Sequence, residues 1–290
     1  MDFVAFDVET ANPDLASICQ VGIVTFEDGR VSETWQTNVN PEDYFDPRNV
    51  GVHNITEETV KDSPNFTTIH KEVAARLSSR IIVSHTSFDR VSIARVCEKY
   101  DLPPIGSNWL DSARVVRRAW PEFSKKGYGL SNVARAFGID FEHHKAHEDA
   151  RAAGEILIRA IRETGLSVHD WLVRARQSIH TRSQSRSTTN NRCATQGNPE
   201  GNLYGEVVVF TGTLSIPRHE AAGLASIAGC EVSDSITTST TLLVVGDQDV
   251  TRLAGHEKSS KHRKAEQLID KGQPIRVLAE RDFRRMVGLA

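Results

Sequence analysis

A polar segment near residues 174–203 limits what this chain can fold into more than any other feature. It reads RARQSIHTRSQSRSTTNNRCATQGNPEGN and contains almost no large apolar side chain. Such a composition cannot bury enough apolar surface to offset the conformational entropy that ordering the chain would cost. We therefore expect two folded domains, residues 1–172 and 204–290, joined by a flexible linker at 173–203.

The composition outside this segment is that of an ordinary globular protein, with 290 residues of which 39% are hydrophobic and 25% charged. No apolar run approaches the roughly 18 residues that a membrane span requires, and no secretory signal precedes the first predicted strand. The four cysteines are far apart and form no CxxC pair, which argues against disulfides and a zinc site and favours a cytoplasmic location. A net charge of -3 argues against a basic surface over the whole protein but leaves a local patch open.

The first domain mixes strand and helix patterns. Alternating residues predict strands at Phe3–Val8, Cys19–Phe26 and Val31–Val39, and the acidic-glycine turn 27–30 predicts an antiparallel hairpin between the second and third. An apolar strand at Ile81–Ser84 lies among helix-spaced patterns, and a long amphipathic helix that includes Ala153–Ile161 is expected to end at Gly165. These patterns predict a mixed α/β domain.

The first strand carries two acids on one face. In VAFDVETAN, side chains alternate, so Asp7 and Glu9 share a face opposite Val4, Phe6 and Val8. Neighbouring carboxylates repel each other unless water or a cation offsets their charge. The two acids therefore indicate either a solvated sheet edge or a cation site.

Three later residues favour the cation. Asp89 follows the apolar strand in the first turn of a helix, and His144 and Asp149 lie where a loop enters the long helix. Acids at strand ends and helix starts can converge at one sheet edge, where Mg²⁺ or Mn²⁺ prefers oxygen ligands and two ions about 3.5–4 Å apart suit phosphodiester cleavage. A neutral imidazole can accept the proton of the attacking water. Asp89 and Asp149 can instead be acids that offset helix dipoles, and His143 and His147 are alternatives to His144.

These motifs resemble a known family. FDVET, SHTSFD and the H-x(4)-D spacing of His144 and Asp149, with GVHNIT and GYGLSNVARAFGI between them, are similar over residues 2–165 to the DEDDh 3′–5′ exonucleases, which include the epsilon subunit of DNA polymerase III and ribonuclease T. The resemblance implies a ribonuclease H-like fold, a mixed sheet flanked by helices. It also implies two ions bound by Asp7, Glu9, Asp89 and Asp149, with His144 as general base and Thr10 at the terminal nucleotide. Asp111 is expected to cap a helix.

The last domain shows strand and helix patterns again. GEVVVFTGTL, SIAGCEVSDSITTSTTLLVVGD and KHRKAEQLIDKGQPIRVLAERDF resemble a BRCT domain, a small α/β fold, with Gly229-Cys230 in place of the usual glycine pair and Phe283 in place of a common tryptophan. The resemblance implies that Thr211, Gly212 and Lys264 hold a phosphate, with Arg218 and Lys261 as further candidates. A tight turn beside a solvated lysine, or a plain protein-docking surface, explains the same residues.

The sequence thus predicts a metal-dependent 3′–5′ exonuclease that removes nucleotides from DNA 3′ ends in DNA repair or replication. Its BRCT domain would dock on DNA ends, a DNA polymerase or repair proteins, and no membrane partner is expected. One alternative is an exoribonuclease with the same chemistry, because the three motifs do not distinguish the sugars. Another is a scaffold without catalysis, which the five intact catalytic positions disfavour.

Overall fold

A computed structural model of the chain describes residues 1–106, 108–124, 127–177, 197–198, 201–247, 258–273 and 275–288. The chain divides into two compact units, Met1–Gln177 and Ser178–Ala290. Residues 178–196, the middle of the predicted linker, lie outside the described residues, so its expected flexibility stays a prediction. No helix among the described segments is long and apolar enough to cross a membrane.

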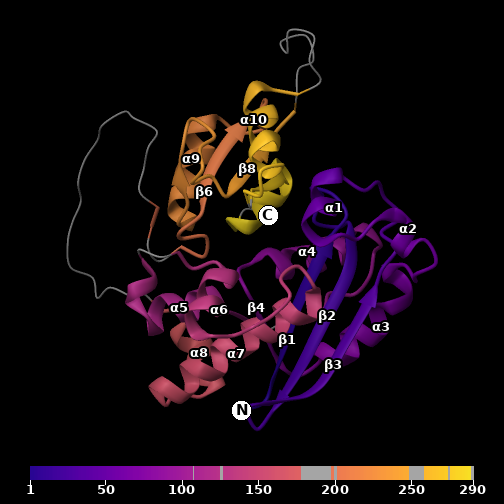
Figure 1. The fold of residues 1–290 in the computed structure, drawn as a ribbon, viewed down its shortest axis with the longest axis vertical. Coiled ribbons are helices and arrows are strands. Elements are labelled where there is room, and N and C mark those ends of the chain that lie inside the picture. The colour runs from indigo at the N-terminus through magenta and orange to yellow at the C-terminus, as the bar shows by residue number, and fades with distance from the viewer. Residues whose placement is uncertain are drawn as a thin grey trace. The chain divides into compact units, whose positions relative to one another are not determined.

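The first unit is built on a five-stranded mixed sheet in the order β3-β2-β1-β4-β5 (Figure 1). The strands are β1 (Phe3–Thr10), β2 (Ile18–Glu27), β3 (Arg30–Asn38), β4 (Ile81–Ser84) and β5 (Asn108–Asp111). β2 pairs antiparallel with both β1 and β3, whereas β4 pairs parallel with β1 and with β5. The predicted hairpin is confirmed, and its turn residues Asp28 and Gly29 both have positive φ, as an acidic-glycine turn allows.

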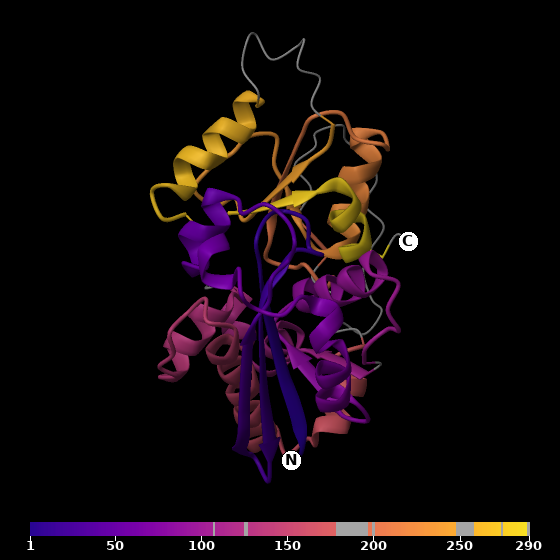
Figure 2. The same ribbon diagram turned by 90° about the vertical axis from the view of Figure 1, so that its right-hand side faces the viewer.

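Helices cover both faces of this sheet, which Figure 2 shows edge-on between them. Val4, Phe6 and Val8 pack in one core with α3 (Phe66–Leu77) and α4 (Phe88–Lys99). On the opposite face lies α7 (Ala146–Thr164), where Phe3 stacks on Phe26 at 4.7 Å. A side chain at Gly154 of α7 would meet the Phe26 ring at 2.3 Å, so this glycine allows the helix to lie close to the sheet.

Shorter helices fill the connections. They are α1 (Pro47–His53), α2 (Glu57–Val60), α5 (Ser112–Ala119), the 3-10 helix η1 (Pro121–Ser124), α6 (Leu130–Phe137) and α8 (Val168–Arg174). The sequence pattern did not predict α1 and α2, because helices of one or two turns show no apolar period. Their caps define them instead: Asp46 accepts from Arg48 N, and Thr56 forms a capping box with Thr59. Helix α7 ends at Gly165, in the left-handed region as predicted.

The second unit has a four-stranded parallel sheet in the order β7-β6-β8-β9. Its strands are β6 (Val207–Thr211), β7 (Glu231–Val232), β8 (Leu242–Val245) and β9 (Arg276–Ala279), and its helices are α9 (Arg218–Ala228), α10 (Ser260–Ile269) and α11 (Glu280–Met286). The sequence pattern predicts a strand over Glu231–Ile236, but β7 ends at Val232. Phe283 is buried and meets Phe210 edge-on at 5.2 Å, so its ring is part of the core of this unit.

The C-terminal end of the predicted linker, residues 201–203, contacts the second unit. Leu203 is 1% exposed, and its N–H donates to the Ala228 carbonyl at 2.7 Å. A side chain at Gly201 would lie 2.0 Å from the same carbonyl oxygen. Residues 201–203 therefore pack on the second unit, although their polar composition placed them in the linker.

Candidate active site

The first unit brings three of the predicted acids together. Asp7 and Glu9 extend from β1 on the face that α7 covers, and Asp149 lies in the first turn of α7. Carboxylate oxygens of these three residues lie within 4.8 Å of one another. Asp7 and Glu9 are half-buried and Asp149 is 5% exposed, so three like charges are concentrated where little water screens them.

The neighbouring strand explains why α7 can reach these acids. Gly22 of β2 is opposite Asp7, and a side chain there would come within 2.2 Å of the Ala146 and His147 backbone. Gln20, opposite Glu9, accepts a hydrogen bond from Ala146 N through Oε1 at 3.0 Å. One residue without a side chain and one amide therefore hold the start of α7 against the end of β1.

Asp89, the fourth predicted acid, lies beside this group without belonging to it. It is in the first turn of α4, is 2% exposed, and accepts a hydrogen bond from Val8 N at 3.2 Å. Its carboxylate therefore reaches the strand that carries Asp7 and Glu9. Among the described residues, the group within 4.8 Å contains Asp7, Glu9 and Asp149 but not Asp89.

Two histidines meet Asp149. The His143 Nδ1 atom lies 3.0 Å from both carboxylate oxygens, and the His144 backbone N–H donates to Oδ2 at 3.2 Å. The two rings stack with their centroids 3.8 Å apart, and His144 has a φ of 67°. His147 instead contacts Gln36 and Glu148. The structure thus places both His143 and His144 at the acids, and the choice of His144 as base stays a prediction.

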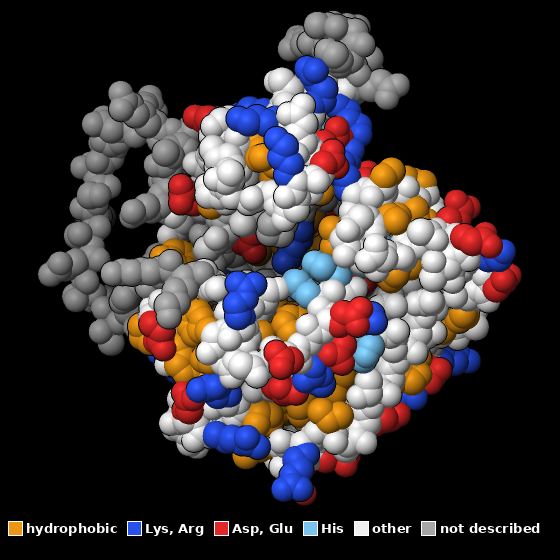
Figure 3. Space-filling model, viewed as in Figure 1, with side chains coloured by type: hydrophobic (Ala, Val, Ile, Leu, Met, Phe, Trp, Pro, Cys, Tyr) orange, Lys and Arg blue, Asp and Glu red, His pale blue; other side chains and the backbone are white. Residues whose placement is uncertain are grey.

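This donor set fits a hard divalent cation. The clustered carboxylates offer several oxygen atoms from different elements, which is what Mg²⁺ and Mn²⁺ prefer, and a positive ion would offset their mutual repulsion. A second group of metal-ligating atoms, from His143, His144 and Asp149, adjoins the first through the shared aspartate. Figure 3 shows histidine and acidic side chains exposed on one face of the molecule.

Thr10 is buried, with 5% of its surface exposed. Its carbonyl accepts hydrogen bonds from Asn49 and His53 of α1. Sequence reasoning assigned no role to either residue, although His53 belongs to the GVHNIT motif. Burial lowers the pKa of His53, while the hydrogen bond to Thr10 opposes that shift.

Asp111 caps a helix, as predicted. Its Oδ1 atom accepts from Ala113 N at 2.8 Å and from Arg114 N at 3.3 Å at the start of α5. The same oxygen accepts from Thr86 N at 3.1 Å. Thr86 has a φ of 77°, which is strained for a β-branched residue, and it lies in the turn just before Asp89. The cap of α5 therefore also supports that turn.

In the second unit, the end of β6 gathers a hydroxyl, a glycine and two cations. Thr211 Oγ1 lies 2.6 Å from Ser259 Oγ, and Gly212 has a φ of 78°. Arg218 donates to the Gly212 carbonyl at 2.8 Å, and Lys261 Nζ donates to the Phe210 carbonyl at 3.3 Å. Burial, followed by the charge of Arg218, lowers the pKa of Lys261.

Lys264, the predicted phosphate lysine, is one turn further along α10. It is exposed and donates no hydrogen bond to Thr211 or Gly212. Among the described residues, the two further candidates, Arg218 and Lys261, donate hydrogen bonds to backbone carbonyls at this strand end.

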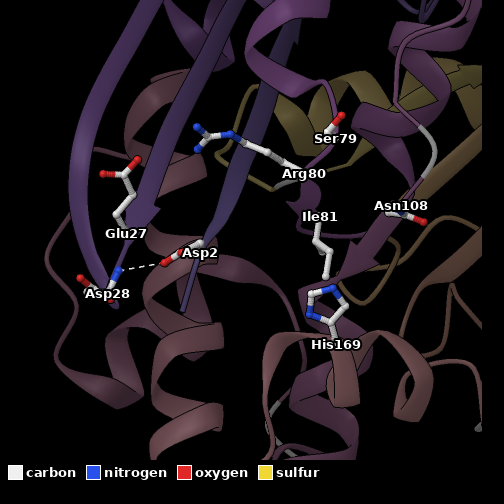
Figure 4. A pocket seen from close by; sticks show the side chains of 8 residues that line it. All are labelled: Asp2, Glu27, Asp28, Ser79, Arg80, Ile81, Asn108 and His169. Atoms are coloured by element: carbon white, nitrogen blue, oxygen red, sulfur yellow. Dashed lines mark hydrogen bonds between the residues drawn. The ribbon is translucent and has the colours of Figure 1, made fainter.

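A cavity of about 410 Å³ lies at the opposite end of the first sheet (Figure 4). It adjoins the start of β1 and the turn between β2 and β3, where Asp28 N donates to Asp2 Oδ1 at 3.0 Å. Its lining is mostly polar and comprises Asp2, Glu27, Asp28, Ser79, Arg80, Ile81, Asn108 and His169. None of the predicted site residues lines it.

Comparison with known proteins agrees with the fold. Residues 4–157, more than half of the chain, match the family model described as Exonuclease, and residues 198–270 match that of the BRCA1 C Terminus (BRCT) domain. The PolC-type DNA polymerase III of Streptococcus pneumoniae is 28% identical over 165 residues, which cover 56% of this chain and 11% of that protein. The chain therefore spans about a tenth of this relative.

Two solved structures share the fold. A 3′-exonuclease described as recognising the 3′ end of a histone mRNA stem-loop is 14% identical, with a TM-score of 0.50, over 56% of this chain and 82% of that one. Exonuclease I is also 14% identical, with a TM-score of 0.50, over 60% of this chain and 42% of that one. With its family match over residues 4–157 and the three acids at the end of β1 and the start of α7, the chain belongs to the exonuclease family.

Proposed function

We propose that this protein is a metal-dependent 3′–5′ exonuclease that removes nucleotides from DNA 3′ ends by two-metal hydrolysis. The observation that carries the proposal is the convergence of Asp7, Glu9 and Asp149 within 4.8 Å, beside two histidines. Carboxylates held this close repel one another, which lowers the stability of the fold unless a cation offsets their charge. Their arrangement on strands and helices therefore favours divalent-cation binding.

The side chains of the site divide the tasks of this mechanism among them. Asp7, Glu9, Asp89 and Asp149 would hold the ions. The ions would lower the pKa of the attacking water and stabilise the leaving oxygen. His144 accepts the proton of the water near neutral pH, and Asp149 fixes the His144 backbone through the N–H bond at 3.2 Å. Thr10, at the end of β1, contacts the terminal nucleotide.

The choice of DNA rests on the relatives. The polymerase that is 28% identical to this chain acts on DNA by its name, and BRCT domains are associated with repair and replication. We therefore assign the chain to repair or replication, in a proofreading-type role that would require a separate polymerase. An exoribonuclease is the second candidate, because one structure with the same fold is described with an mRNA stem-loop.

One assay separates these functions. Purified protein is incubated with 5′-labelled single-stranded and duplex DNA and RNA, in Mg²⁺, Mn²⁺ or chelator, beside Asp7→Asn. A DNA ladder that shortens from the 3′ end and requires both metal and Asp7 supports the proposal. Faster loss of RNA than of DNA would favour the exoribonuclease. No degradation of any substrate would indicate a scaffold.

We propose that the BRCT domain binds a phosphate at the end of β6, and that a DNA end or a partner protein carries this phosphate. Thr211 supplies a hydroxyl and Gly212 a backbone N–H, and the cation is Lys264, as the motif predicts, or Lys261, which lies closer to the strand end. Binding of duplexes with and without a 5′-phosphate is compared by fluorescence anisotropy for wild type, Lys261→Gln and Lys264→Gln. Equal affinity for both duplexes in wild type would contradict the assignment, and the variant that loses the difference identifies the lysine.

A further inference from the structure

Two side chains of α1 hold the last residue of β1. The Thr10 carbonyl oxygen accepts hydrogen bonds from Asn49 Nδ2 at 2.8 Å and from His53 Nε2 at 3.1 Å. The Asn49 amide also lies 3.3 Å from Thr10 Oγ1. Ile55 N donates to His53 Nδ1 at 3.0 Å, so the neutral ring carries its proton on Nε2 and donates it to Thr10.

The strand needs this support at this point. The pairing of β1 with β2 shifts between Glu9 and Thr10, so that Glu9 is opposite Gln20 but Thr10 is opposite Ile18. Such an irregularity interrupts the ladder of hydrogen bonds and bends the strand. Thr10 is also buried, and a buried carbonyl without a donor is unfavourable. Pairing resumes beyond the irregularity, where Ala11 N donates to the Ser17 carbonyl at 2.8 Å, and the two donors of α1 hold Thr10 between that contact and Glu9.

We propose that His53 and Asn49 are positioning residues that fix Glu9 for divalent-cation binding. The inference rests on the proposed role of Glu9 as a metal ligand. Glu9 lies beside the like-charged Asp7, and their repulsion would move the two carboxylates apart if the strand end were free. The hydrogen bonds from α1 to Thr10 oppose that movement, and residues that orient metal ligands in this way affect metal affinity without touching the ion.

Mn²⁺ affinity of the full chain, measured by isothermal titration calorimetry, tests this role. His53→Ala and Asn49→Leu each remove one donor to Thr10, and each should weaken Mn²⁺ binding by roughly tenfold or more. His53→Gln keeps an N–H donor on a side chain of similar reach and should restore most of the affinity.

His70 provides a matched control. The residue is 7% exposed, close to the 8% of His53, and its Nε2 likewise donates to a backbone carbonyl, that of Pro103, at 2.8 Å. His70 lies on α3, away from the acids. We therefore expect His70→Ala and His53→Ala to lower the thermal midpoint of unfolding by similar amounts. His70→Ala should leave Mn²⁺ affinity unchanged.

Wild-type Mn²⁺ affinity in folded His53→Ala and Asn49→Leu would overturn the inference. If His53→Ala does not fold by circular dichroism, Asn49→Leu decides, because Asn49 is only half-buried. Glu9→Ala separates this inference from the proposed function. Loss of Mn²⁺ binding in Glu9→Ala alone would refute only the positioning role, whereas unchanged binding in Glu9→Ala would refute the metal assignment itself.

Discussion

Asp7 and Gly22 lie opposite each other on β1 and β2, and the backbone of α7 crosses the sheet where a side chain of residue 22 would be. The missing side chain is what lets a helix distant in sequence bring Asp149 to Asp7. The glycine opposite Asp7 in the sheet therefore allows the acidic site to form.

Gly22→Ala should damage stability and activity together. Its Cβ would lie 2.2 Å from backbone atoms of Ala146 and His147, which cannot rotate away as a side chain can. We expect a loss of about 1–3 kcal/mol in the free energy of unfolding, and a fall in kcat of up to about 100-fold from the displacement of Asp149. Denaturant unfolding and single-turnover assays measure these. Gly51→Ala, which has open space around its Cβ, should keep wild-type activity.

Asp7→Asn should abolish cleavage while the fold stays intact. Removing one of three close carboxylates relieves repulsion, so in chelator the variant should be as stable as wild type or slightly more stable. Loss of an ion ligand worth several kcal/mol should lower kcat by about 1,000-fold or more. Asp62→Asn, on an exposed turn, is the control and should change neither quantity. A marked fall in the melting temperature of Asp7→Asn would contradict this reading.

His144→Ala should cost more activity than His143→Ala. Removal of a general base lowers the rate by about 100-fold to 10,000-fold. His143 bonds to Asp149 at 3.0 Å and stacks on His144, so we expect its loss to cost less than tenfold, as a supporting contact would. Steady-state kcat of the two variants in excess Mg²⁺ decides between them. The reverse order would make His143 the base.

Acid should destabilise the wild type more than His53→Gln. Burial holds the pKa of His53 below its ordinary value in the folded chain, so the unfolded chain takes up the proton more readily. The contribution of His53 is therefore complete above about pH 6.5 and is lost as the pH falls from there through the folded-state pKa. Melting temperatures of both proteins between pH 8 and pH 5 test this. Parallel profiles would count against a buried neutral imidazole.

Thr86→Asn should stabilise the first unit. Thr86 has a φ of 77°, a conformation that asparagine adopts more readily than a β-branched residue. We expect a gain of about 1 kcal/mol in the free energy of unfolding, with unchanged kcat. Thr37→Asn, on strand β3, should not stabilise the protein, because threonine suits a strand better. Lower stability of Thr86→Asn would show that the threonine side chain contributes more than its backbone costs.

The local features of this structure could be predicted from the sequence, whereas the long-range contacts could not. Period-two alternation assigned Asp7 and Glu9 to one face, because that pattern depends only on neighbouring residues. The approach of α7 depends on a glycine in another strand, and the support of Thr10 comes from Asn49, which is 39 residues away. No local pattern encodes such contacts.

The second unit shows a different limit. The sequence pattern predicts a helix over about residues 260–271, close to the observed α10, yet the choice among its lysines depends on which side chain faces the end of β6. Lys261 and Lys264 are three residues apart, so a helical pattern places both on neighbouring turns of the same side. The packing of Leu203 could not be predicted for another reason, because a single apolar residue in a polar segment shows no hydrophobic periodicity.

Asp89 makes a contact that matters for the choice of an inactive variant. Its carboxylate accepts the Val8 N–H at 3.2 Å and so joins the start of α4 to the central strand. Replacing Asp89 would disturb a buried contact between two elements as well as the chemistry. A substrate-trapping protein, made to hold DNA or a partner without cutting it, is therefore better built on Asp7→Asn, which keeps the size and shape of the side chain it replaces.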